Sequence, residues 1–67
     1  MNYSVTADME TKYGVIISVT ACGGDLIITT KEQNGTHSQH ISFYDNPEDV
    51  RTLIQMLELG LKQMEMK

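Results

Sequence analysis

The sequence predicts an α+β fold, in which a four-stranded antiparallel β-meander is followed by one C-terminal α-helix that packs on one face of the sheet. Two observations support this prediction. Residues favoured in strands, such as Thr, Val, Ile and Tyr, dominate up to Tyr44, and residues favoured in helices dominate after Pro47. Three turn-like segments divide the first part of the chain, and three turns separate four strands.

These turns place the strands at residues 2–9, 13–22, 25–33 and 36–44, and the helix at 47–66. We expect all 67 residues to form a single domain, because domains rarely fall below about 50 residues. The chain is 40% hydrophobic and 21% charged. That composition is typical of a folded globular protein rather than a disordered or membrane-embedded one.

Two glycine-containing turns set the predicted register. Asn34-Gly35 is typical of a two-residue type I′ hairpin loop, because both residues tolerate positive φ, and Gly23-Gly24 serves the same purpose. Two-residue loops at both sites gather the apolar residues of the last three strands on one face of the sheet. The resulting pairs are Val19 with Ile28, Ala21 with Leu26, Ile28 with Ile41, and Leu26 with Phe43.

The first hairpin is predicted to turn through a three-residue loop at Glu10-Thr11-Lys12. This loop would pair Val5 with Ile17 and Tyr3 with Val19. The first strand is therefore expected to extend the same apolar face.

The helix has a well-specified start. Asn46 is suited to cap it, Pro47 to occupy the first helical position, and Glu48 and Asp49 to favour its positive N-terminal end. Apolar residues then recur at spacings of three and four, and they form one stripe that we expect to cover the sheet. The stripe comprises Val50, Leu53, Ile54, Leu57, Leu61 and Met64.

Further apolar residues lie on the back and flank of the helix. A chain this short has room for only a small core, and its single cysteine excludes an internal disulfide. We therefore predict a homodimer that forms through the back of the helix or through a sheet edge, although scattered apolar residues on a surface are also normal. Flexible methionines suit such an interface, and a glycine permits close approach of another backbone. The predicted interface comprises Met56, Leu59, Gly60 and Met66.

The sheet face opposite the core is rich in hydroxyl groups and also carries isoleucine and tyrosine. It is either an ordinary solvated face or a binding platform, since antiparallel sheets commonly expose one side. We predict that it binds a macromolecular partner, and we expect that partner to be a protein. The predicted binding face comprises Ile16, Ser18, Thr20, Ile27, Thr29, Lys31, His40, Ser42 and Tyr44.

The spacing of the candidate catalytic residues gives little support for an enzyme. The register separates Cys22 from His40 by about 16 Å, far beyond the roughly 3 Å of a hydrogen bond. His37 and His40 are three apart on one strand, so they project to opposite faces and do not share a metal. Gly23-Gly24 joins antiparallel strands and opens no phosphate-binding helix. We expect no enzymatic activity, cofactor or metal, although a site built across a dimer interface would escape this argument.

The expected compartment is the cytoplasm. Residues 1–5 have neither the basic start nor the apolar run of a secretory signal. The longest unbroken apolar stretch in a strand, residues 15–17, is far shorter than the roughly 20 residues of a membrane-spanning helix. A lone cysteine also fits a reducing compartment.

The order of elements is similar to that of the positive-cofactor coactivators. The resemblance covers most of the chain. In the sequence itself it is limited to the strand-to-helix junction, where a helix begins at Asn46-Pro47-Glu48 after Ile41-Ser42-Phe43. It implies binding of single-stranded DNA by a dimer. The net charge of −4 departs from that pattern, and only Lys12 and Lys31 are placed to support a basic sheet or loop.

The favoured function is therefore a small non-enzymatic interaction module, a homodimeric accessory or inhibitor protein. Its size and lack of motifs are typical of phage and mobile-element proteins. The alternative is a small protein that binds single-stranded nucleic acid or sequesters a nucleotide. Imitation of the phosphate backbone ranks third, because the nine acids are dispersed rather than regularly arrayed.

Overall fold

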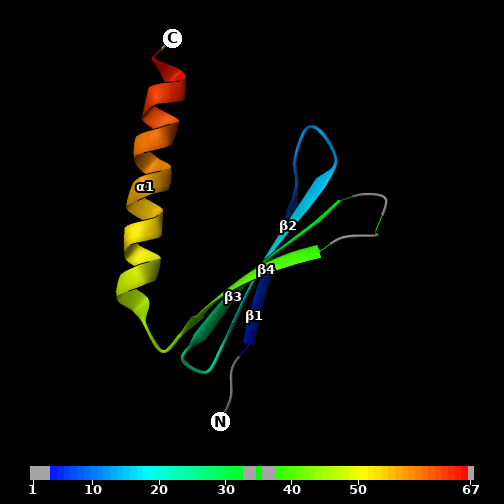
Figure 1. The fold of residues 1–67 in the computed structure, drawn as a ribbon, viewed down its shortest axis with the longest axis vertical. Coiled ribbons are helices and arrows are strands. Elements are labelled where there is room, and N and C mark those ends of the chain that lie inside the picture. The colour runs from blue at the N-terminus through cyan, green and yellow to red at the C-terminus, as the bar shows by residue number, and fades with distance from the viewer. Residues whose placement is uncertain (1–3, 33–34, 36–37, 67) are drawn as a thin grey trace.

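The computed structural model describes residues 4–32, 35 and 38–66. Four strands form one open antiparallel sheet in the order β1-β2-β3-β4, and a single helix, α1, follows β4 (Figure 1). This confirms the predicted order of four meandering strands and a C-terminal helix. The elements are β1 (Ser4–Glu10), β2 (Val15–Cys22), β3 (Asp25–Glu32), β4 (Ser38–Tyr44) and α1 (Pro47–Glu65).

The register of β2, β3 and β4 is the predicted one. Leu26 lies opposite both Ala21 and Phe43, and Ile28 lies opposite both Val19 and Ile41. A two-residue loop therefore joins β2 to β3, as the glycine pair indicated.

Each of the two glycine-containing turns has a glycine with positive φ. Between β2 and β3, only Gly23 has positive φ (64°), which is the φ pattern of a type II′ turn rather than the predicted type I′. Both types match the twist of the strands, so the register is unaffected. Between β3 and β4, Gly35 has φ 75° and its N–H donates to the carbonyl of Glu32 at 2.9 Å. The predicted type I′ turn includes Asn34, which lies outside the described residues.

The predicted pairing of the first strand is wrong by four residues. Val5 lies opposite Ala21, not Ile17. The second predicted pair involved Tyr3, which lies outside the described residues. Because a four-residue shift is even, β1 still presents the same side chains to the apolar face of the sheet.

A glycine explains the difference. Gly14 has φ 86°, the left-handed conformation that the last position of a three-residue hairpin loop requires. The loop therefore consists of residues 12–14 and starts two residues later than predicted. Thr11 closes it, since its N–H donates to the carbonyl of Val15 at 2.8 Å and its hydroxyl accepts from the N–H of Val15 at 3.1 Å.

The helix begins as predicted, at Pro47. The side chain of Asn46 accepts a hydrogen bond from the backbone N–H of Asp49 at 3.4 Å and donates one to the carboxylate of Asp49 at 2.9 Å. Glu48 and Asp49 occupy the first turn, and Glu48 pairs with Arg51. The cap thus satisfies one of the backbone donors that every helix leaves free at its start.

Replacing this cap should have a measurable cost. We expect Asn46→Ala to lower the free energy of unfolding by about 1 kcal/mol, the typical contribution of a capping side chain. Urea unfolding followed by far-UV circular dichroism would measure it. Asn46→Ser, which keeps a capping oxygen, should retain most of the stability. Equal losses in the two variants would contradict a capping role.

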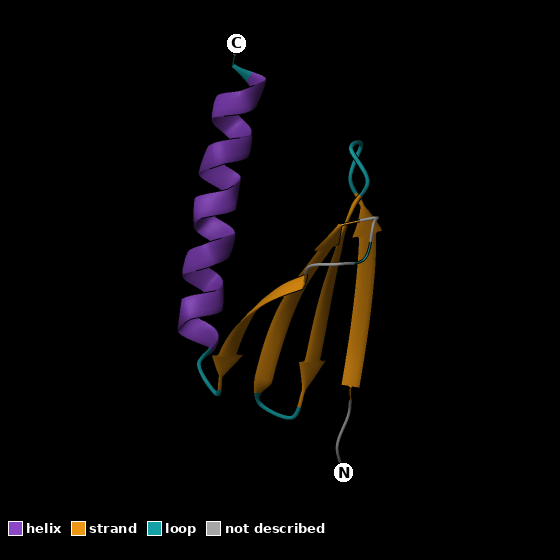
Figure 2. Ribbon diagram, turned by 45° about the vertical axis from the view of Figure 1, so that its right-hand side comes forward, coloured by secondary structure: helices purple, strands orange, loops and turns teal. Residues whose placement is uncertain are grey.

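The apolar stripe of α1 does not cover the sheet, which corrects the predicted packing. Helix and sheet meet only at the first turns of the helix, where Val50 and Leu53 are half-buried, and they then diverge (Figures 1 and 2). Further along, Leu57 is 64% exposed and Met64 is 74% exposed. No described side chain is fully buried. The radius of gyration is 13.8 Å, against about 11 Å for a compact domain of this length.

A short junction holds the helix in this direction. Only Asp45 and Asn46 separate β4 from α1. The backbone N–H of Asp45 donates to the carbonyl of Gly24 and to the side chain of Asp25, both at 3.1 Å, and Asp45 has φ 49°. A Cβ on Gly24 would lie 3.0 Å from the Asp45 carboxylate. The β2–β3 turn is therefore fitted against the junction.

Candidate interaction surfaces

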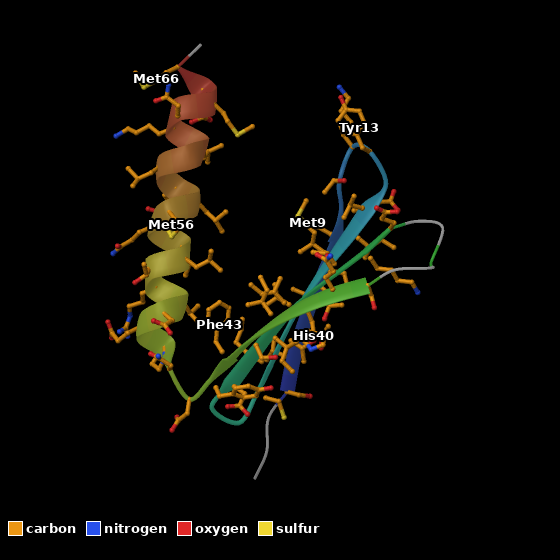
Figure 3. All side chains as sticks on the ribbon, viewed as in Figure 1. Met9, Tyr13, His40, Phe43, Met56 and Met66 are labelled. Atoms are coloured by element: carbon orange, nitrogen blue, oxygen red, sulfur yellow. The ribbon has the colours of Figure 1, made fainter. Side chains whose placement is uncertain are left out.

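The apolar face of the sheet is open along the side that faces α1. Val5 is 67% exposed and Ile41 is 58% exposed. Figure 3 shows Met9 and Phe43 on this side of the sheet, with Phe43 next to the first turns of the helix. The apolar residues that the register assigns to this apolar sheet face are Val5, Ala7, Met9, Val15, Ile17, Val19, Ala21, Leu26, Ile28, Ile41 and Phe43.

Packing is loose even where helix and sheet meet. A hollow of about 430 Å³ lies at the junction, and Leu26 and Phe43 of the sheet and Val50 of the helix contribute to its lining. From there α1 and the sheet diverge (Figure 2), and the apolar side chains of both remain exposed. An apolar surface of this extent is unusual on a protein that functions as a monomer.

The single chain exposes more surface than a compact monomer of its size would. The chain exposes 6036 Å², whereas a compact monomer of its size would expose about 4,200 Å². The difference is roughly 1,800 Å² per chain, so two copies that buried it would bury about 3,600 Å² together. Obligate homodimer interfaces bury about 2,000 to 5,000 Å².

Three of the residues predicted to form a dimer interface lie on α1, and Met66 follows its last residue. They are exposed, but so is most of the stripe. Leu59 is 70% exposed, close to the value for Leu57, and Met56 and Met66 are comparable. A Cβ on Gly60 would meet no atom within 4 Å. Exposure in the single chain therefore does not single out the back of the helix as the contact surface.

Their positions around the helix do differ. At about 100° per residue, Met56 and Gly60 border the stripe, whereas Leu59 and Met66 lie on the opposite side of the helix. The predicted set thus divides into two residues that widen the apolar stripe and two that stand apart from it.

The opposite face, here the polar sheet face, carries all nine residues predicted for partner binding. His40 lies on this far side of the sheet from the helix (Figure 3), and Ile27 and Tyr44 are exposed on it. Across the sheet from β1 to β4, its four rows are Ser4-Cys22-Asp25-Tyr44, Thr6-Thr20-Ile27-Ser42, Asp8-Ser18-Thr29-His40 and Glu10-Ile16-Lys31-Ser38.

Residues of β1 on this face were missed by the sequence prediction. Thr6 lies opposite Thr20, with their hydroxyl oxygens 3.4 Å apart, and Asp8 and Glu10 place two carboxylates along the same edge. The alternation of side chains along the predicted strand could have identified Thr6 and Asp8, because the register error was even, whereas Glu10 was predicted to lie in the loop. Lys31 is the only lysine or arginine among the described residues of this face.

The structure keeps Cys22 and His40 apart. Cys22 and His40 lie in different rows, two strands apart, and Cys22 is free and exposed beside the β2–β3 turn. His37 is outside the described residues. Within the described ranges, no three His, Cys, Asp or Glu residues gather in a way that could hold a metal ion. Nor does that part of the chain contain a helix of the length and hydropathy needed to cross a membrane.

The fold and these surfaces define a small α+β protein with an open β-meander and a C-terminal helix. Comparison with protein-family models, with curated proteins and with solved structures finds no match.

Proposed function

We propose that the protein is a small non-enzymatic interaction module that works as a homodimer and binds a macromolecular partner, a protein, through its polar sheet face. The observation that carries this proposal is the exposed apolar surface of the single chain. The chain exposes roughly 1,800 Å² more surface than a compact monomer would. A second copy can bury this surface without any further component. An accessory or inhibitor protein would act in this way.

The polar sheet face is the surface that remains available once the apolar side is covered. Short hydroxyl side chains on β2, β3 and β4 offer donors and acceptors, and Ile27 and Tyr44 add exposed apolar area. Aromatic and apolar anchors within a polar rim are typical of protein-binding surfaces. These features support binding at this face.

The charges of the face favour a protein partner over a nucleic acid. Lys31 shares it with the carboxylates of Asp8, Glu10 and Asp25. Binding of single-stranded nucleic acid typically combines a basic groove with several stacking aromatic residues. On the described part of this face the only aromatic side chains are those of Tyr44 and His40.

Native mass spectrometry of the protein purified gently from cells that express it would test the proposal. We expect a dimer mass and a retained macromolecule. That macromolecule should be lost from Thr29→Arg, on the polar sheet face, and kept by the matched control Thr52→Arg on α1. A monomer mass would contradict the homodimer. A nucleotide or oligonucleotide in its place would favour the alternative function, and a partner still held by Thr29→Arg would place the binding site elsewhere.

A further inference from the structure

We infer that the two copies exchange helices, so that α1 of each chain packs against the apolar sheet face of the other. This inference rests on the homodimer proposed above and specifies its interface. It places the contact on the apolar sheet face and on the stripe of α1, widened by Met56 and Gly60 of the predicted interface. The other two predicted residues, Leu59 and Met66, lie on the opposite side of the helix and outside this contact.

The first reason is that the helix is held away from its own sheet. The junction has two residues, and the N–H of Asp45 is bound to both Gly24 and Asp25 of the β2–β3 turn. Pro47 fixes a further φ angle at the start of the helix. Closing α1 onto its own sheet would require these restraints to change, because no longer loop exists to absorb the movement.

The second reason is that the single chain leaves two apolar surfaces exposed at once, the apolar sheet face and the stripe of α1. An occupant that covers both must be apolar on two sides. A second sheet would present its polar face to one of the two surfaces. A helix suits this role better, since side chains project from it in all directions around its axis and a wide apolar sector can contact two neighbours.

The third reason is the width of the apolar surface on α1. Packing on a sheet requires an apolar stripe of about 100°. With Met56 and Gly60 added to the stripe, the apolar sector spans about 160° at 100° per residue. That width is sufficient for contact with the partner sheet through Leu57 and Leu61 and with the partner helix through Met56 and Gly60. The absence of any atom near a Gly60 Cβ within the single chain leaves room for that second helix.

The location of α1 in the chain makes the exchange geometrically simple. The helix leaves from β4, which is an edge strand. Two copies related by a two-fold axis can therefore each lay α1 across the other sheet without threading a loop. The same contacts are made twice, as in any symmetric dimer.

Isotope-filtered NMR on the unmodified protein tests this inference. Chains labelled with ¹³C and ¹⁵N are unfolded together with an equal amount of unlabelled chains, refolded and checked for their mass by sedimentation. We expect a dimer with cross-peaks between copies that join the methyl groups of Leu57 and Leu61 to those of Val19 and Ile41. A fully labelled sample serves as the control, and it should show none of these filtered cross-peaks.

The contrary results are distinct from one another. A dimer whose helix-to-sheet cross-peaks are all within one chain, with contacts between copies at Leu59 and Met66, would overturn the exchange and leave the homodimer intact. A monomer in sedimentation would overturn both the exchange and the proposed function.

Discussion

Leu57→Glu should convert the dimer into an unfolded or aggregating chain, whereas Leu59→Glu should leave the dimer intact. Truncating a buried leucine costs about 2 to 5 kcal/mol, and a charge left without a partner adds to that cost. Each dimer contains the substitution twice, so the dimer should weaken by at least about 1,000-fold. Sedimentation velocity would report the mass, and far-UV circular dichroism the helix and sheet content.

The two leucines form a matched pair. They are two residues apart on the same helix, and in the single chain Leu57 is 64% and Leu59 is 70% exposed. If the protein functioned as a monomer of this shape, the two glutamates would have the same small effect. If Leu59→Glu dissociated the dimer and Leu57→Glu did not, the interface would lie on the back of the helix.

The second large effect is on the dependence of stability on concentration. Because folding and association should be coupled, each tenfold dilution should lower the apparent free energy of unfolding by about 1.4 kcal/mol. For two chains that unfold together, this corresponds to a fall in Tm of roughly 3 to 6 °C per tenfold dilution. Thermal unfolding at about 2, 20 and 200 μM, chosen to span two tenfold steps, would measure it.

A variant supplies the control for this measurement. Asn46→Ala weakens the helix cap in both copies and should lower Tm at every concentration, but it should leave the slope against concentration unchanged. A Tm that stayed constant over the whole range would mean that the single chain is stable alone. The exposed apolar surface would then need an explanation other than a second copy.

Much of the fold follows from local signals in the sequence. The two-residue turns predicted at 23–24 and 34–35 correspond to the register observed for β2, β3 and β4, and the alternation of apolar residues supports it, because a slip by one residue would move every apolar side chain to the wrong face. The start of α1 is equally local, since Asn46 and Pro47 act on neighbouring backbone groups. The membership of the two sheet faces was therefore predictable for these three strands.

The first hairpin was less predictable from its residues. Polar residues at 10–12 suggested a turn, but the position of the loop depends on Gly14, whose positive φ closes it. The error moved the pairing by four residues and left the faces unchanged. The alternation of side chains already assigned Asp8 to the polar sheet face, whereas the predicted loop at 10–12 placed Glu10 outside the strand.

By itself the sequence determined the elements, the register of the last three strands and the apolar stripe of α1, because propensity, turn chemistry and periodicity act over a few residues. Only the tertiary structure decided where that stripe points. The contacts of Asp45 with Gly24 and Asp25 join segments about 20 residues apart and direct α1 away from its own sheet. An amphipathic pattern predicts that one face of a helix is buried. The direction in which α1 leaves the sheet decides which surface can bury it.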